Sequence, residues 1–420
     1  MTLYSDTILK STDKAKNDQK LNICIITHCY PPDFGAAPHQ YEHMAKSFQK
    51  EGHHVSVITS HPYYPSGKLK KEDRYKFISE TNENGITVRR HWLLPSQKNN
   101  SILRLISMMT MLMSMLFSLP YLKRNKIDLI ICQTPPISLP FLAILAKKRY
   151  NIPIILNVSD LWPQAMVDIN HLRKSSFTYK LLHKVEKYFY KKADHIVTQS
   201  IESQEYIQQL GFQKPQIYRI GADIDTFKPS DKDLNEKRYK MVYMGVLGVA
   251  HGLSQLITQI PFDSLGIDFH IYGNGIDLPK IKHIIKEKGL NSIKVFAPIP
   301  YQQVPQVLQE YDLAFISQIN YVRGTLPAKL FESLSMGLPI IFHGDGEGAK
   351  IVEENDCGWV SNPNAPEGLV YNLKEITQSN RNVLIKKGQN ARALCTQHFD
   401  RDQQFNDLMK TVYQNFTTKS

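Results

Sequence analysis

The stretch RGTLPAKLFESLSMGLPII, residues Arg323 to Ile341, constrains the fold of this chain more than any other. It predicts a turn, a short helix and a buried strand. Thr325 is expected to cap the start of the helix, and Gly337 to end it before the apolar strand Leu338 to Phe342. The buried face of the helix is marked by three leucines that repeat every four residues, Leu326, Leu330 and Leu334. A helix that leads into a buried strand is typical of α/β domains.

Three charged residues interrupt this otherwise apolar stretch. Lys329 and Glu332 are three residues apart, so they lie on one helical face, and Arg323 comes just before the helix. Cations beside a helix N-terminus favour an anion, most often a phosphate. A carboxylate one turn further along can accept hydrogen bonds from a ribose. The pattern therefore suits a nucleotide-sugar, although an ordinary Lys–Glu pair on a surface helix remains an alternative.

The charge balance of the chain favours an anionic partner. The 420 residues include 51 Lys and Arg against 39 Asp and Glu, which gives a net charge of +12. No aromatic and basic pattern of a nucleic-acid-binding module is present, so a phosphorylated substrate or a membrane surface fits better. The five cysteines have no metal-like spacing, and their odd number in a long chain favours a cytoplasmic protein without disulfides.

The N-terminal half begins with a strand, a loop of small residues and a helix. Leu21 to Thr27 reads as a buried strand, and Val55 to Thr59 as the next one. Between them, Gly35, Ala36 and Ala37 allow backbone N–H groups to approach a ligand closely. This order is typical of a doubly wound sheet, whose ligands bind beyond the carboxyl ends of the strands.

Asp160 follows another apolar strand, Ile152 to Val158, and therefore falls at such a carboxyl end. We consider it a candidate for positioning an acceptor hydroxyl or taking its proton. The alternative is that Asp160 caps a helix or stabilises a turn.

The segment from Leu105 to Leu122 contains no charged residue and is rich in methionine. Three interpretations are open: a helix packed on the sheet, a helix dipping into a membrane interface, and a transmembrane helix. The last is disfavoured because the strand Asp128 to Gln133 should rejoin the sheet that contains Leu21 to Thr27. Basic residues that would favour anionic lipid headgroups flank the segment: Arg104, Lys123, Arg124 and Lys126.

The pattern R-x-x-x-P-x-K-L-[FY]-E-x-[LM]-[SA]-x-G-x-P resembles the donor-site helix of family 4 glycosyltransferases, and more narrowly their WbuB-like branch, the N-acetyl-L-fucosamine transferases of O-antigen and capsule synthesis. The loop around Gly35 and the D-x-W-P motif at Asp160 agree with it. The resemblance implies the α/β fold called GT-B, two Rossmann-like doubly wound domains facing a cleft. It places Glu332 on the ribose and Arg323 and Lys329 near the diphosphate.

The same resemblance implies further donor contacts in the C-terminal half. Gly245 and Gly248 would bring backbone N–H groups to the diphosphate, with His251 as the nearby cation. Gly273 and Gly275 belong to a G-N-G turn, and Glu347 to a G-D-G-E-G turn, and both turns resemble family motifs. In the family, the segment that corresponds to Ile299 lies near the nucleotide base. Many family members carry a second glutamate where this chain has Gly324.

The domain limits follow from these patterns. We expect a disordered lead-in at 1–20, an acceptor-binding domain at 21–220, a linker at 221–238, a nucleotide-sugar-binding domain at 239–399, and a final helix at 400–420 that packs back on the first domain.

By resemblance, the chain is expected to be a retaining transferase that moves a sugar from a UDP-sugar to an undecaprenyl-diphosphate-linked glycan on the cytoplasmic face of the membrane. No metal ion or other cofactor is expected, and the pair Asp223 and Asp225 in the linker is discounted as a metal site. A UDP-sugar epimerase of the same fold and a catalytically silent assembly protein are the alternatives.

Overall fold

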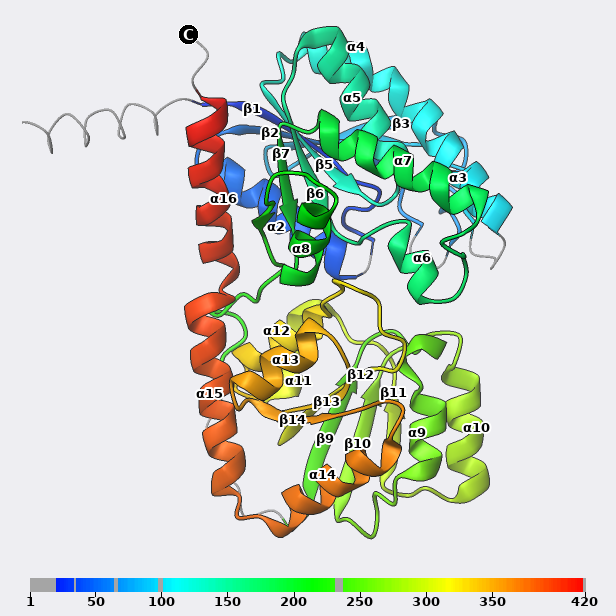
Figure 1. The fold of residues 1–420 in the computed structure, drawn as a ribbon, viewed down its shortest axis with the longest axis vertical. Helices are drawn as coiled ribbons and strands as arrows, with labels where there is room; N and C mark the ends of the chain where they lie inside the picture. The colour runs from blue at the N-terminus through cyan, green and yellow to red at the C-terminus, as the bar shows by residue number, and fades with distance from the viewer. Residues whose placement is uncertain (1–19, 34, 64–66, 97–100, 231–236, 418–420) are drawn as a thin grey trace, which may run out of the picture.

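The computed structural model describes residues 20–417, apart from 34, 64–66, 97–100 and 231–236. The chain forms two sheets, each covered by helices on both faces, stacked one above the other along the long axis of the molecule (Figure 1). Every strand pair is parallel except β3 with β4. The structure thus has the two doubly wound, Rossmann-like domains that the sequence predicted.

The first sheet has the strand order β3-β4-β2-β1-β5-β6-β7-β8. Its strands are β1 (Asn22–Ile26), β2 (His54–Ser60), β3 (Ile78–Glu83), β4 (Ile86–His91), β5 (Leu129–Thr134), β6 (Ile154–Val158), β7 (His195–Thr198) and β8 (Gln216–Ile217). The helices are α2 (Ala36–Lys50), α3 (Ser101–Met115), η1 (Leu116–Ser118), α4 (Leu119–Arg124), α5 (Ser138–Tyr150), α6 (Gln164–Asp168), α7 (Phe177–Lys192) and α8 (Ile201–Gln209).

The second sheet has the order β11-β10-β9-β12-β13-β14. Its strands are β9 (Tyr239–Met244), β10 (Ile267–Tyr272), β11 (Ile293–Phe296), β12 (Leu313–Gln318), β13 (Ile340–Gly344) and β14 (Gly358–Ser361). The helices are η2 (Val249–His251), α9 (Leu253–Gln259), α10 (Leu278–Lys288), η3 (Tyr301–Gln303), α11 (Val304–Leu308), α12 (Ala328–Ser335), α13 (Glu347–Glu354), α14 (Pro366–Gln378) and α15 (Asn382–His398).

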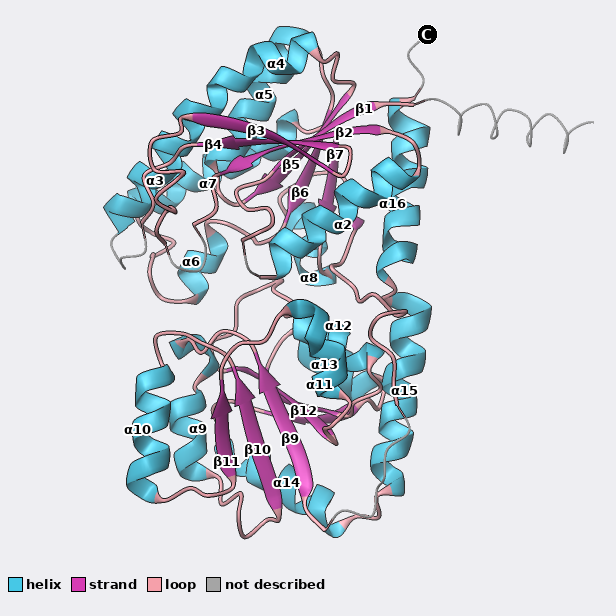
Figure 2. Cartoon of the chain, turned by 180° about the vertical axis from the view of Figure 1, so that it is seen from behind, coloured by secondary structure: helices cyan, strands magenta, loops and turns pink. Residues whose placement is uncertain are grey.

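The last helix, α16 (Arg401–Phe416), leaves the second domain and runs along the first (Figure 2). Its apolar residues Phe405 and Leu408 are buried in the core that β1 and α2 form. The ring of Phe405 meets that of Phe48 edge-on, with 4.9 Å between centroids. The chain therefore crosses between the domains twice. The two crossings are paired, because the N–H of Ala222 donates to the carbonyl of Phe399, and that of Arg401 donates to Ala222, both at 2.9 Å.

The uncharged segment forms α3, η1 and α4, which follow one another without a break. By length and composition alone, Leu103–Arg124 could cross a membrane. However, β5 pairs with β1 in the same sheet, and Met111, Met115 and Leu122 are buried in the core on that sheet. The segment packs on the sheet, as the first of the three interpretations predicted.

The hydroxyl groups of this segment face the protein rather than the solvent. Ser114 Oγ donates to the carbonyl of Trp92 at 2.6 Å, and Ser118 Oγ accepts from Arg89 Nε at 2.9 Å. The opposite face is apolar and exposed. Its large residues and their exposed fractions are Leu105 (54%), Met109 (48%), Met113 (55%) and Phe117 (61%). The segment is therefore apolar on its exposed face as well as on the face that packs in the core, unlike a usual surface helix of a soluble protein.

Candidate active site

The helix predicted from the key stretch is α12. Its leucines Leu330 and Leu334 are buried, and so is Leu326, which lies just before the helix. Thr325 does not cap it, so that expectation was wrong. The helix begins after Pro327 without a side-chain cap, and the Thr325 hydroxyl instead donates to Asp160 Oδ1 of the first domain at 3.1 Å. Strand β13 also begins two residues later than expected, because the N–H of Leu338 is still bonded to Ser333 of the helix.

Asp160 lies just past the end of β6, at the carboxyl edge of the first sheet. Burial raises the pKa of this carboxyl, and the hydrogen bond from Thr325 partly offsets the rise. A carboxylate with a raised pKa is a better proton acceptor than an exposed one. The geometry is therefore compatible with the role predicted for Asp160, and that role stays a prediction.

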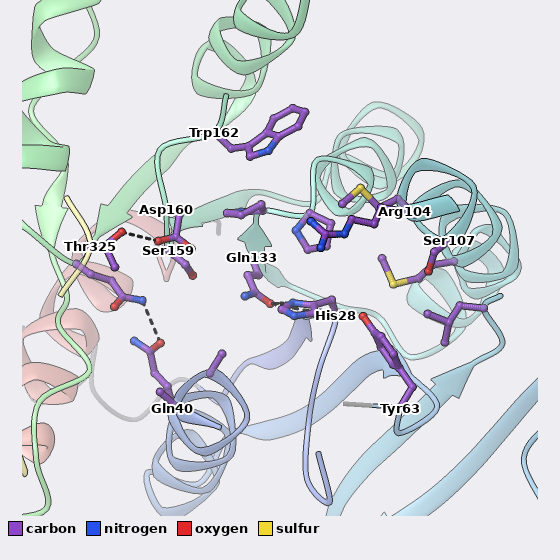
Figure 3. A pocket seen from close by; sticks show the side chains of 18 of the residues that line it. His28, Gln40, Tyr63, Arg104, Ser107, Gln133, Ser159, Asp160, Trp162 and Thr325 are labelled. Atoms are coloured by element: carbon purple, nitrogen blue, oxygen red, sulfur yellow. Dashed lines mark hydrogen bonds between the residues drawn. The ribbon is translucent and has the colours of Figure 1, made fainter. Parts of the chain in front are cut away.

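A cavity of about 580 Å³ opens beside Asp160, in the size range of small-molecule sites (Figure 3). Ala36 and Ala37 line it at the start of α2, and Gly35 is the N-cap residue of that helix. On the floor of the cavity, His28 Nδ1 lies 2.9 Å from Gln133 Oε1. The small-residue loop and the D-x-W-P loop thus meet at one cavity, and its use as an acceptor site stays a prediction.

Lys329 lies on the other side of the domain interface, in the second domain. Its ammonium group is 3.8 Å from the centroid of the Tyr243 ring. Burial lowers the pKa of Lys329 to about 7, while the charge of Glu332 opposes the shift. A Cβ atom at Gly245 would lie 3.0 Å from Lys329 Nζ, so a glycine here leaves room for the ammonium. The expected donor loop and donor helix are therefore in contact.

His251 is the second basic group of this region. Its Nδ1 lies 2.8 Å from the carbonyl oxygen of Ser317, and burial together with the charge of Lys329 lowers its pKa. Its ring also lies close to Gly248, because a Cβ at that glycine would be 3.9 Å from His251 Cδ2. His251 is thus held neutral beside Lys329, where it can donate or accept a hydrogen bond but adds no charge.

The turn at Gly273 and Gly275 packs against this same loop. A Cβ at Gly273 would lie 2.0 Å from the carbonyl oxygen of Gly245, and one at Gly275 would lie 2.3 Å from that of Leu247. Backbone packing alone therefore accounts for both glycines, and their part in donor binding stays a prediction. Ile299, on the loop after β11, is partly exposed, and its place near the nucleotide base is likewise a prediction.

Glu332 faces a cluster of polar residues that the sequence did not point to. Burial raises the pKa of its carboxyl, while the charge of Arg401 and the hydroxyl of Tyr301 lower it. Arg401 begins α16, and Tyr301 stacks on His39 of the first domain with 4.3 Å between ring centroids. Glu332 therefore lies where both domains and the last helix meet. Nothing in the local sequence around Glu332 indicated Arg401.

Arg323 is directed toward the first domain. Its guanidinium lies over the ring of Tyr206, 5.5 Å from the centroid, and its backbone N–H donates to Asp168 Oδ2 at 3.0 Å. The structure thus shows Arg323 at the domain interface. Its contact with a diphosphate stays a prediction.

A carboxylate of the first domain stands next to the position where many family members carry a second glutamate. Glu202 Oε2 accepts hydrogen bonds from the Tyr321 hydroxyl and from the N–H of Gly324, both at 2.9 Å. Gly324 has φ +79°, and a Cβ there would lie 2.0 Å from Ser203 Oγ. The glycine lets the loop 321–325 lie against the start of α8.

Glu347 also lies at this interface. It is 7% exposed and forms an ion pair with Arg219, and its Oε2 accepts the N–H of Glu202 at 3.2 Å. The sequence predicted a donor contact for Glu347, and that contact stays a prediction beside the interdomain one.

The linker pair forms a local turn. Asp223 Oδ1 accepts from the N–H groups of Asp225 and Thr226 at 3.1 and 2.9 Å. Within the described residues, no group of three or more His, Cys, Asp or Glu is arranged to hold a metal ion.

Two protein-family models match the chain and together cover most of it. Residues 35–222 match the glycosyl transferase 4-like domain, and residues 225–392 match the glycosyl transferases group 1. The chain is a glycosyltransferase with a 4-like N-terminal domain and a group 1 C-terminal domain. The boundary between the two matches falls in the first crossing between the domains.

Two curated proteins are distantly related. The probable glycosyltransferase WbjE of Pseudomonas aeruginosa is 22% identical over 265 residues, which are 60% of this chain and 66% of WbjE. The colanic acid biosynthesis glycosyl transferase WcaI of Escherichia coli is 25% identical over 329 residues, which are 73% of this chain and 79% of WcaI.

Solved structures confirm the GT-B fold. Sucrose-phosphate synthase from Thermosynechococcus elongatus superposes with a TM-score of 0.75 at 15% identity, covering 95% of this chain and 100% of that chain. HepE of Anabaena, solved in complex with UDP and glucose, superposes with a TM-score of 0.67 at 16% identity, covering 94% and 100%.

Proposed function

We propose that this glycosyltransferase moves a sugar from a UDP-sugar to an undecaprenyl-diphosphate-linked glycan, with retention of the anomeric configuration and without a metal ion. The enzyme would act in surface polysaccharide synthesis, O-antigen or capsule, while bound peripherally to the cytoplasmic face of the membrane. N-acetyl-L-fucosamine, the sugar of the WbuB-like branch, is the donor sugar that we would test first.

One observation carries this proposal: a single helix, α3, forms both a wall of the cavity and an exposed apolar surface. Ser107, Met108 and Met111 line the cavity that contains Asp160. Leu105 and Met109, on the same helix, are exposed to solvent. An acceptor whose glycan enters the cavity can therefore keep its lipid in a membrane that touches the outer face of α3.

The apolar surface extends beyond α3 onto its neighbours. α3 packs beside α5, and α5 beside α7. These two helices contribute further exposed apolar side chains, which are Phe141, Leu145, Phe177 and Leu181. α5 ends with Lys147, Lys148 and Arg149, and α7 with Lys191 and Lys192. Apolar residues bordered by basic ones suit a membrane with anionic lipids.

The second domain supplies the features that a nucleotide diphosphate needs. Lys329 can stabilise the charge on the departing diphosphate, together with the backbone N–H groups near Gly245 and Gly248. Asp160, 3.1 Å from the Thr325 hydroxyl, lies at the junction with the acceptor cavity. HepE, solved with UDP and glucose, and WcaI, named for colanic acid biosynthesis, support a UDP-sugar donor and a polysaccharide product.

Calorimetry of UDP, GDP and dTDP binding tests the donor, followed by transfer from UDP-N-acetyl-L-fucosamine to a lipid-linked acceptor and NMR of the anomeric centre in the product. UDP-selective binding with transfer supports the proposal. Epimerisation of the UDP-sugar without any transfer would favour the epimerase instead. Absence of binding to all three nucleotides would favour a silent assembly protein.

Sedimentation with liposomes tests the membrane contact separately. We expect Met109→Asp and Met113→Asp to reduce binding to anionic liposomes, because each places a charge in the apolar surface. Tyr371→Asp is the matched control, since Tyr371 is 68% exposed on α14 of the second domain. Equal binding by all three variants would refute the membrane contact through α3.

A further inference from the structure

We propose that Arg104 binds the diphosphate of the acceptor, at the end of the cavity opposite Asp160. The inference rests on the proposed function, because it concerns the substrate of the same site. It assigns a phosphate-binding residue to the acceptor side, where the sequence had indicated only a general attraction of the segment's ends for anionic lipid.

The cavity has a basic end and an acidic end. Arg104 lines it from the first turns of α3, and Asp160 lines it beside Thr325. Figure 3 shows the Arg104 side chain reaching into the cavity from α3, with Asp160 on the far side beyond Trp162 and Gln133. An acceptor that carries phosphates at one end and sugar hydroxyls at the other is oriented by these two charges, since Asp160 repels the phosphates and Arg104 attracts them.

The chemistry of Arg104 suits a diphosphate in particular. A guanidinium stays charged at every physiological pH, and its fixed fork of donors can bind two phosphate oxygens at once. Ser107 follows one turn later and also lines the cavity, and its side chain is nearly buried. His28 lies across from Arg104 in the same cavity (Figure 3). The Ser107 hydroxyl could donate a further hydrogen bond to the phosphates, whereas the one N–H of a neutral His28 is directed at Gln133 Oε1.

The position of Arg104 also explains where the lipid would go. The next two residues on the helix, Leu105 and Ile106, are exposed, and Met109 continues the apolar surface. Arg104 thus lies at the border between the cavity and that surface. A polyprenyl diphosphate has the same order of groups: a sugar, then two phosphates, then an apolar chain.

The phosphate that Arg104 binds could belong to the acceptor diphosphate or to the headgroup of a membrane lipid. Calorimetry with farnesyl diphosphate, farnesyl monophosphate and farnesol separates them, with saturating UDP present to occupy the donor site. We expect Arg104→Ala to weaken the binding of farnesyl diphosphate by roughly 10- to 100-fold, as loss of a charge-assisted hydrogen bond does. Farnesol binding should not change, and Arg104→Lys should recover part of the affinity.

Lys123→Ala is the matched control. Lys123 ends the same helical segment, is exposed, and lies outside the cavity. It should leave farnesyl diphosphate binding unchanged, and both variants should bind UDP as the wild type does. If wild-type protein binds farnesyl diphosphate and Arg104→Ala binds it equally well, the role of Arg104 is refuted while the proposed function stands.

Two other outcomes also decide the matter. If Arg104→Ala and Lys123→Ala both lose affinity for anionic liposomes and neither loses affinity for farnesyl diphosphate, Arg104 contacts headgroups and the proposal is wrong. If wild-type protein transfers sugar to a water-soluble glycan and binds no prenyl diphosphate, the lipid-linked acceptor and the role of Arg104 are both overturned.

Discussion

Replacing Gly324 by alanine tests how the two domains are held together. Gly324 has φ +79°, and a Cβ there would lie 2.0 Å from Ser203 Oγ and 3.0 Å from Ser200 Oγ, both at the start of α8. The left-handed conformation costs a residue other than glycine roughly 1–2 kcal/mol, and overpacking adds roughly 1–3 kcal/mol. The sum, roughly 2–5 kcal/mol, destabilises the closed arrangement of the domains, in which loop 321–325 contacts α8.

The variant should therefore open at the domain interface rather than unfold. Since about 1.4 kcal/mol is a tenfold change, the lower end of that range already shifts the ratio of closed to open protein by about 30-fold. We expect kcat/KM for transfer to fall by at least that factor, if closure is required, and small-angle scattering to show a larger radius of gyration. The melting temperature of the separate domains should change little, because neither core is touched.

A second substitution makes this reasoning testable. Ser203→Ala removes the oxygen at 2.0 Å and leaves the Ser203 Cβ at 3.3 Å from the added methyl group. In the double variant Gly324→Ala, Ser203→Ala, most of the overpacking cost should be removed, but the cost of the left-handed backbone should remain. If Gly324→Ala is as active and compact as the wild type, or if Ser203→Ala rescues nothing, the contact with α8 does not control closure.

Three further predictions concern the donor and acceptor sides. The pKa of Lys329 is about 7 in the free protein, and a bound diphosphate favours the charged amine. The UDP association constant should therefore fall as the pH rises above 7, by up to about tenfold per pH unit. Lys329→Arg, which stays charged, should flatten this dependence on pH. An unchanged dependence in that variant would exclude contact between Lys329 and the diphosphate. Glu332→Ala should weaken UDP binding by roughly 10-fold or more in calorimetry. Inorganic diphosphate binding should fall less, because it loses only the support that Glu332 gives to the charged form of Lys329. Equal losses would argue against the ribose contact. Thr325→Val removes a hydrogen bond that lowers the pKa of Asp160, so the acidic limb of the kcat profile should move to higher pH, while Thr325→Ser should leave it in place.

Local patterns in the sequence predicted most of the fold. The buried leucines of α12, the parallel strands and the small-residue loop at the start of α2 each depend on neighbours within one element, so spacing alone reveals them. The same holds for Lys329 and Glu332, which share a face of α12. The transmembrane interpretation of the uncharged segment was disfavoured because the next strand had to rejoin β1, and that pairing is present.

The contacts between domains could not be predicted in this way. Thr325 and Asp160 are 165 residues apart, and no local pattern distinguishes a threonine that caps a helix from one that bonds to another domain. Glu202, beside Gly324, belongs to a helix with no recognised motif. The direction of Ser114 and Ser118, toward the protein, depends on where β4 and the residue after it lie.

The paired crossings at Ala222 and Phe399 limit how the cleft can open. A single linker would leave the domains free to swivel and twist in all directions. Here two segments run side by side and share backbone hydrogen bonds of 2.9 Å, and α16 anchors the second segment in the core of the first domain. Opening of the cleft must therefore bend both segments about one hinge axis. Lys329 of the second domain and Asp160 of the first would then separate along one path. They would return to the same relative position after every turnover.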